Sequence, residues 1–241
     1  MERERENEPL LGVLGGMGPE ATQIFYRHLI RRTKAARDQD HIRALIFGDA
    51  TVPDRTAAIL SGDTADVEAR LVADAKTLEA AGCTLLAMTC NTAHHFAPAI
   101  QGEVSIPLLH MPDLAVRRAK DLGVKKLALL ATEGCIQAGV YQDICAQEGV
   151  PCWTPDGETQ AKVTKLIYEQ IKAGQRGDEA LFAAIDCAVK AAGCDGAVLG
   201  CTELSVYRAF HPLDERYIDA MEVLVEACVT ACGKTLTEDT P

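Results

Sequence analysis

One stretch of the sequence occurs twice, and this repeat limits the folds that the chain can adopt. Residues 80–92 read AAGCTLLAMTCNT, and residues 191–203 read AAGCDGAVLGCTE. Each copy ends an expected helix at Ala-Ala-Gly, continues as a short apolar run, and places a cysteine just after that run. Such a short apolar run is typical of a buried strand in a parallel sheet. We therefore expect Cys90 and Cys201 at equivalent strand ends, where ligands bind in open α/β sheets.

A second similarity links the segments that follow the first expected strand of each half. Residues 10–14 and 126–131 are apolar runs that we expect to form strands, and each is followed by a glycine-containing loop and a helix. The spacing from Gly18 to Ile24 equals the spacing from Gly134 to Val140. This correspondence between the two halves indicates an internal duplication.

Strands that alternate with helices predict an α/β fold with parallel sheets flanked by helices. The duplication predicts two pseudo-symmetric domains of this kind, with the active site in the cleft between them. The expected boundaries are 9–108 plus 206–233 for the N-terminal domain that carries Cys90, 109–205 for the second domain that carries Cys201, and 1–8 and 234–241 for flexible tails.

Four local expectations bear on the site. They are a helix at residues 20–37, a loop at 48–56, a helix opened by Asn91 and Thr92, and irregular chain at 207–212. The glycine-rich segment at residues 15–18 lacks the G-x-G-x-x-G spacing of a dinucleotide-binding loop. We interpret it as a tight strand-to-helix turn, or as a turn whose backbone N–H groups approach a carboxylate.

Composition and charge argue against several classes of protein. The formal net charge of −11 is unsuited to nucleic-acid binding, which needs a basic surface. No apolar run is long enough to span a bilayer, and the charged N-terminus lacks the apolar core of a signal peptide. Ten cysteines without a Cys-x-x-Cys pair indicate free thiols in a reducing cytoplasm. Cys228 and Cys232 lie one helical turn apart, but no nearby histidine completes a zinc site.

Two cysteines in equivalent positions suggest a symmetric chemical task. A thiol acts as a base only as a thiolate, and a helix N-terminus beside the sulfur favours that form. One cysteine can take a proton from one face of a carbon atom while the other returns a proton to the opposite face, which inverts a stereocentre. Asn91, Thr92 and Thr202 would supply donors for a substrate carboxylate or a developing enolate oxygen. The alternative is that both cysteines only pack in the core, as buried cysteines often do.

Several short segments elsewhere in the chain are also informative. They read GGMGP at 15–19, PDRT at 53–56, CNTAH at 90–94, GCTEL at 200–204, TEG at 132–134, GVY at 139–141, IYE at 167–169 and IDAM at 218–221. Together they resemble the aspartate/glutamate racemase family, and the branch they resemble most is that of the cofactor-independent aspartate racemases. The resemblance covers nearly the whole chain apart from its two ends.

The resemblance implies a homodimer that works without pyridoxal phosphate, any other cofactor or a metal. It implies that Cys90 and Cys201 are the two acid/base residues, and that Arg55 and Lys172 bind substrate carboxylate. The implied substrate is aspartate, with glutamate as a further candidate. The residues expected to bind substrate are Met17, Arg55, Asn91, Thr92, Thr132, Lys172, Thr202 and Glu203.

Some residues separate the branches of this family. The Gly-Gly-Met-Gly turn and the Cys-Thr-Glu segment favour the aspartate type over cell-wall glutamate racemases, which usually have Asp-Ser-Gly and Cys-Thr-His. Thr89 stands where relatives often carry proline, and Cys135 stands where they often carry threonine, which removes a hydroxyl that could hold substrate. Three alternatives stay open: a broad aspartate/glutamate racemase, a maleate-isomerase-like enzyme that uses one cysteine as nucleophile or proton donor, and a non-catalytic protein that closes on an amino acid.

Overall fold

The computed structural model describes residues 8–238, and within them the chain forms two parallel four-stranded sheets. The first sheet has the order β2-β1-β3-β4 and the second has the order β6-β5-β7-β8. The repeated order confirms the expected α/β fold and its duplication, because β3 and β7 occupy the same place in their sheets. The strand bounds are β1 (Leu10–Gly15), β2 (Arg43–Gly48), β3 (Leu85–Met88), β4 (Leu108–Leu109), β5 (Leu127–Ala131), β6 (Cys152–Trp153), β7 (Gly196–Gly200) and β8 (Tyr217–Asp219).

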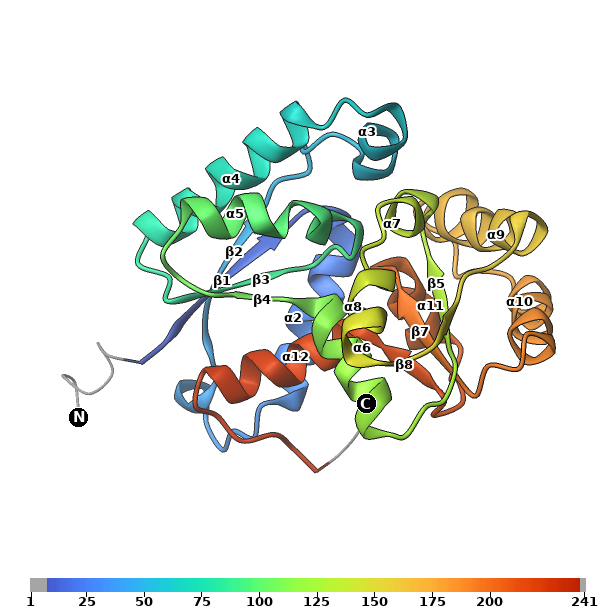
Figure 1. Ribbon diagram of the computed structural model, residues 1–241. Coiled ribbons are helices and arrows are strands. Elements are labelled where there is room, and N and C mark those ends of the chain that lie inside the picture. Colours follow the sequence, from blue (N-terminus) through green and yellow to red (C-terminus); the bar gives the residue numbers. More distant parts are fainter. Residues whose placement is uncertain (1–7, 239–241) are drawn as a thin grey trace.

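Helices connect the strands and flank both sheets (Figure 1). The α-helices are α2 (Pro19–Arg32), α3 (Arg55–Ser61), α4 (Ala65–Ala80), α5 (Ala97–Glu103), α6 (Met111–Asp121), α7 (Glu133–Gln137), α8 (Gln142–Glu148), α9 (Gly157–Thr164), α10 (Glu179–Ala191), α11 (Thr202–Phe210) and α12 (Ala220–Ala231). Shorter elements are the 3₁₀ helices η1 (Asp38–Asp40) and η2 (Thr92–Phe96) and the π-helical η3 (Lys165–Ile171). Of the helices in the described part of the chain, none has both the length and the apolar character that crossing a membrane requires.

Successive residues of β1 point to opposite faces of the first sheet, as the pleat of a strand dictates. Leu11 and Val13 belong to a core that continues through the second sheet. Leu14 belongs to a separate core with Leu86 and Leu71, under α4 and α5. Figure 1 shows α4 and α5 on one face of the first sheet and α12 on the other. One apolar core therefore joins the two halves and fixes the sheets relative to each other.

The C-terminal region differs from the expected division of the chain. Residues 206–233 were expected in the first domain, but β8 pairs in parallel with β7 and so belongs to the second sheet. Residues 234–238 were expected to be part of a flexible tail, yet Leu236 forms an antiparallel bridge with Thr33. The rest of the two expected tails, residues 1–7 and 239–241, lies outside the described residues. The other domain boundaries stay predictions.

Three local elements also differ from expectation. The helix expected to run to residue 37 ends at Arg32, where the Thr33 hydroxyl donates a hydrogen bond to the carbonyl of Leu29. The segment after Cys90 is a 3₁₀ helix rather than an α-helix, since Pro98 lacks an N–H and would clash with the preceding turn. The chain expected to be irregular from residue 207 continues as α11 to Phe210.

Candidate active site

All ten residues that the sequence analysis assigned to catalysis or substrate binding line one narrow cavity. Asp54, Thr56 and Tyr168 line it with them. Its two thiols come from the ends of the corresponding strands β3 and β7. The complete lining is Met17, Asp54, Arg55, Thr56, Cys90, Asn91, Thr92, Thr132, Tyr168, Lys172, Cys201, Thr202 and Glu203. Their chemical roles stay predictions at this point.

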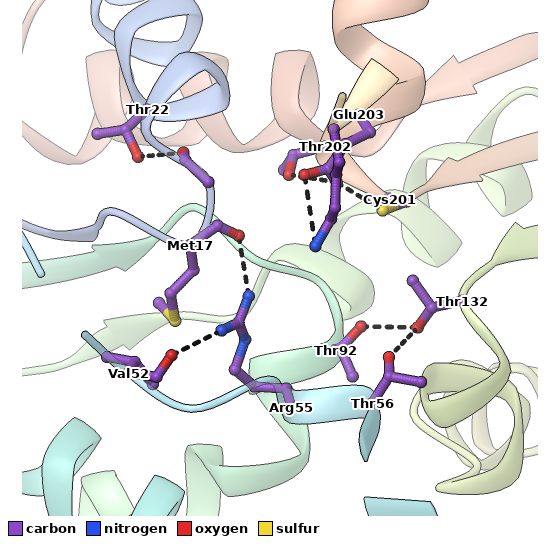
Figure 2. Close-up of polar contacts among 12 residues, drawn as sticks. Met17, Thr22, Val52, Arg55, Thr56, Thr92, Thr132, Cys201, Thr202 and Glu203 are labelled. Atoms are coloured by element: carbon purple, nitrogen blue, oxygen red, sulfur yellow. Dashed lines mark hydrogen bonds and ion pairs between the residues drawn. The ribbon is translucent and has the colours of Figure 1, made fainter. Parts of the chain in front are cut away.

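The thiol of Cys201 lies beside the carboxylate of Glu203 (Figure 2), and that carboxylate in turn faces the ammonium of Lys172. Cys201 is the N-cap of α11, and its Sγ donates to Oε2 of Glu203 at 2.8 Å. Nζ of Lys172 lies 3.8 Å from the other oxygen of Glu203 and 4.7 Å above the ring of Tyr168. Burial and the Glu203 carboxylate raise the pKa of Cys201 well above its ordinary value, and Lys172 partly opposes them. This cysteine therefore rests as a thiol.

A guanidinium occupies the other side of the cavity, beside Cys90. Arg55 is 8% exposed and begins α3, rather than lying in a loop as expected, because Asp54 caps that helix by accepting from the N–H of Ala57. Its guanidinium donates to the carbonyls of Val52, Pro53 and Met17 at 3.1, 2.9 and 3.3 Å. Burial acts to lower the pKa of Arg55, but the nearby Cys90, Asp54 and Tyr168 together outweigh it and raise that pKa. Cys90 thus has a cation, Arg55, beside it, whereas the Cys201 thiol donates to an anion, Glu203.

A buried histidine fixes the backbone at Cys90. The N–H of Met111 donates to Nε2 of His94 at 3.1 Å, so Nε2 is an acceptor and Nδ1 carries the proton. Nδ1 then donates to the carbonyl of Cys90 at 2.8 Å. Burial lowers the pKa of His94 to about 3, with a smaller contribution from His110. His94 is therefore neutral at physiological pH and positions Cys90 without exchanging protons.

Asn91 presents an unpaired donor in the cavity. Its Oδ1 accepts a short hydrogen bond from the hydroxyl of Tyr141, which fixes the orientation of the amide. Its Nδ2 is buried and has no hydrogen-bond partner among the described residues. A buried donor without a partner costs about 1–3 kcal/mol, so this amide is suited to a ligand oxygen.

Three threonine hydroxyls join the two halves across the cavity (Figure 2). Thr132 follows the last residue of β5, and its Oγ1 lies 3.1 Å from Oγ1 of Thr56 and 2.9 Å from Oγ1 of Thr92. Thr132 also caps α7 by accepting from the N–H of Cys135. Beside this bridge, Gly134 lies against the backbone of Thr56, and a Cβ there would come within 2.7 Å of the Thr56 Cα. The absence of a side chain at Gly134 lets α3 and α7 meet.

The two departures from the family pattern lie behind the cavity rather than in its lining. The Thr89 hydroxyl lies 3.1 Å from that of Thr22, which in turn accepts from the N–H of Gly16 at 2.9 Å. Gly16 has φ +88°, and a Cβ there would collide with the backbone of Asp49. The glycine turn is therefore held by packing and by Thr22, and the Gly16 N–H is already occupied.

Cys135 is fully buried in α7, so its thiol does not take the place of a substrate-binding hydroxyl.

The cavity is closed in this conformation. Its lining leaves about 10 Å³ for the centre of a water molecule, which is room for roughly one water. A second cavity of about 260 Å³ shares Met17, Arg55, Lys172 and Glu203 with the first. These four side chains therefore separate an inner chamber, which contains the thiols, from a larger outer chamber.

Sequence reasoning missed several members of this site. Thr56, Tyr141 and Tyr168 occur in the motifs that indicated the family. The contacts of Thr56 with Thr132 and of Tyr141 with Asn91 join segments distant in the sequence, whereas Tyr168 lies four residues before Lys172. Within residues 8–238, no group of three or more His, Cys, Asp or Glu side chains is arranged to hold a metal ion. Activity without a cofactor or metal stays a prediction.

Comparisons with known proteins relate this site to one family. The sequence profile of the Asp/Glu/hydantoin racemase family matches residues 14–228. The broad specificity amino-acid racemase RacX of Bacillus subtilis is 30% identical over 162 residues, which is 66% of this chain and 69% of RacX.

Solved structures show the same architecture. The aspartate racemase of Picrophilus torridus superposes with a TM-score of 0.81 at 29% identity, over 95% of this chain and 96% of that one. Glutamate racemase of Francisella tularensis, solved in complex with D-glutamate, has a TM-score of 0.64 at 17% identity, over 94% of this chain and 81% of that one. The second likeness concerns the fold alone.

Proposed function

The chain belongs to the Asp/Glu/hydantoin racemase family, and we propose that it interconverts L- and D-aspartate with Cys90 and Cys201 as paired acid/base groups. The observation that carries this proposal is the presence of both thiols in one buried cavity, one from each half of a duplicated fold. A non-catalytic binding protein would not need matched thiols. A mechanism with a single cysteine would not need the second one.

The opposite charges beside the two thiols suggest how the cycle begins. The Arg55 guanidinium lies beside Cys90, so we assign the first proton abstraction to this sulfur, whose negative charge would then face a cation. Cys201 begins as a thiol that donates to Glu203. The Cys90 thiolate removes the α-proton from one enantiomer, and Cys201 delivers its proton to the opposite face of the carbon. After turnover Cys90 carries the proton and Cys201 carries the charge, which is the state required by the other enantiomer.

The intermediate of this reaction carries charge on the α-carboxylate, where hydrogen-bond donors are needed. The unpaired Nδ2 of Asn91 is such a donor, and the Thr92 and Thr202 hydroxyls lie in the same lining. Fixed donors of this kind stabilise a developing oxyanion because they need no reorientation during the reaction. We assign Asn91, Thr92 and Thr202 to the α-carboxylate.

The remaining charged groups match the rest of an aspartate molecule. Lys172 and Arg55 lie where a side-chain carboxylate would otherwise be buried without a partner, which is costly. Glu203 already faces one ammonium group, that of Lys172 at 3.8 Å, and is suited to the substrate ammonium. Met17, whose carbonyl accepts from Arg55, and Thr132 would complete the pocket.

Substrate entry requires an opening movement. The inner chamber has room for about one water, so aspartate cannot enter this conformation without a change. The outer chamber and the inner chamber are separated by Met17, Arg55, Lys172 and Glu203. We propose that the halves separate across the Thr56–Thr132 contact and close again on bound substrate. Closure of this kind would exclude water from the carbanion intermediate.

A broader amino-acid racemase is the second candidate function. The outer chamber of about 260 Å³ could receive a side chain longer than that of aspartate. RacX, to which the chain is similar, is named a broad-specificity racemase. For either activity we expect a homodimer in the cytoplasm. Size-exclusion chromatography with light scattering would measure the mass of the oligomer in solution.

The test is a chiral chromatographic assay of L-aspartate, L-glutamate and L-alanine. We expect aspartate to react fastest and glutamate about 10- to 200-fold more slowly, because one methylene changes binding by about 1–3 kcal/mol. Alanine should be slower still. Lys172→Met should lower the rate with aspartate much more than the rate with alanine, whereas Lys165→Met, an exposed lysine of η3, should change neither. Equal losses on both substrates would refute the carboxylate assignment.

A further inference from the structure

A basic cleft lies away from the thiols, at the far ends of two helices that begin in the active site. Helix α2 starts directly after the Met17 turn, and α11 starts directly after Cys201. Arg27, on α2, lies about 12 Å along the helix from its start, at 1.5 Å per residue. The cleft between these helices has a volume of about 440 Å³. Its walls therefore connect to both halves of the catalytic cavity.

Three arginines give this cleft its positive charge. Arg27 and Arg31 are exposed and one turn apart on α2, and neither side chain has an ion-pair partner within residues 8–238. Like charges at this spacing repel and destabilise a helix, so a bound anion would relieve them. Arg208 faces them from α11 and uses one guanidinium nitrogen, Nη1, for the carbonyl of Tyr217 at 2.9 Å.

The cleft also contains a buried polar atom without a partner. His28 is 8% exposed, and its Nδ1 has no hydrogen-bond partner in the described part of the chain. Burial lowers the pKa of His28; Asp219 opposes this, and Arg27, Arg31 and Arg208 add to it. The imidazole is therefore neutral at physiological pH and can donate one hydrogen bond.

Two carboxylates also line the cleft, and neither forms an ion pair with Arg27 or Arg31 within residues 8–238. Asp219 caps α12 and accepts from the N–H groups of Met221 and Glu222 and from the Ser205 hydroxyl. Glu222 lies 3.9 Å from Nε of Arg32. Asp219 is therefore held by the protein, whereas Oε1 of Glu222 accepts no hydrogen bond in the described part of the chain. The donors of Arg27 and Arg31 stay available to a ligand.

From this arrangement we infer that the cleft binds a small oxyanion, a phosphate or a carboxylate, between α2 and α11. The anion would neutralise arginines from both walls and hold the two helices together. The inference does not rest on the proposed racemase activity, because it concerns residues outside the catalytic cavity.

Isothermal titration with inorganic phosphate, and separately with citrate, tests this inference and distinguishes the two kinds of oxyanion. We expect saturable binding of at least one of them at a single site. The double change Arg27→Gln with Arg31→Gln should weaken that binding about tenfold or more, because charge-assisted hydrogen bonds are lost. The control Lys125→Gln with Lys165→Gln removes the same charge from exposed positions elsewhere and should leave binding unchanged.

Two outcomes would overturn the inference. One is the absence of saturable binding by either anion. The other is equal binding by the arginine double variant and the wild type, together with competition against aspartate, which would assign the anion to the catalytic cavity. Circular dichroism of the double variant would verify that the exposed changes leave the fold intact.

Discussion

Replacing Gly134 with alanine should interfere with closure of the catalytic cavity. The new Cβ would stand 2.7 Å from the Cα of Thr56, whereas ordinary contacts begin at 3.4 Å, so α3 and α7 would have to separate by at least 0.7 Å. Overpacking of this kind costs about 1–3 kcal/mol. If that cost falls on the closed state, the ratio of closed to open molecules decreases about 5- to 150-fold. The Thr56–Thr132 hydrogen bond would be strained at the same time.

The assay for this change is kcat/KM for aspartate, measured by chiral chromatography at limiting substrate. We expect Gly134→Ala to lose about one to two orders of magnitude, which is the size of effect that a 1 Å misplacement can have. Gly102→Ala is the matched control, because Gly102 lies in α5 and its Cβ would meet no atom within 4 Å. Wild-type kcat/KM in Gly134→Ala would refute the role of the α3–α7 contact in closure.

Three further predictions concern Glu203, His94 and the need for a cofactor. Glu203→Gln removes a carboxylate that raises the pKa of Cys201, so the alkaline fall of kcat/KM, where Cys201 loses the proton that it must donate, should move to lower pH, and an unchanged profile would contradict this. Since the equilibrium constant of a racemase is one, both enantiomers should show the same profile. His94 has a pKa lowered from 6.5 to about 3, so its contribution to folding stability is complete above pH 6.5 and is lost as the pH falls toward 3. His94→Leu should flatten that part of the acid-unfolding curve, whereas the same change at the exposed His95 should not. Protein dialysed against chelator and hydroxylamine should keep full activity, and recovery only on adding metal or pyridoxal phosphate would show that a cofactor is needed.

The repeat in the sequence was sufficient to predict the fold and the position of the two cysteines. The short apolar runs before Cys90 and Cys201 predicted buried strands, and these strands occupy equivalent places in the two sheets. The assignment of residues 206–233 to the first domain failed at β8, because strand pairing depends on which sheet edge is free. A local pattern does not contain that information.

The sequence predicted which residues belong to the site, but not the hydrogen bonds that they form there. The motifs contained Arg55, but not the hydrogen bonds that its guanidinium donates to three backbone carbonyls. They contained both Asn91 and Tyr141, but not the hydrogen bond by which Tyr141 fixes the Asn91 amide from 50 residues away. The contact between Cys201 and Glu203 is the exception, since a residue two positions after an N-cap can reach back to it. Long-range hydrogen bonds depend on packing, and packing depends on the whole fold.

The most direct test of the two-thiol account is racemisation of L-aspartate in heavy water by the wild type and by Cys90→Ser and Cys201→Ser. The two-thiol mechanism predicts D-aspartate that carries deuterium at the α-carbon in its first turnovers, because the returned proton comes from the second thiol and not from the substrate. Each serine variant should lose several orders of magnitude in racemisation, since a serine hydroxyl is too weak a base at neutral pH. Cys83→Ser, a buried cysteine outside the cavity lining, should retain activity. Near-normal turnover in either cavity variant, or D-aspartate that keeps the original proton, would contradict the account.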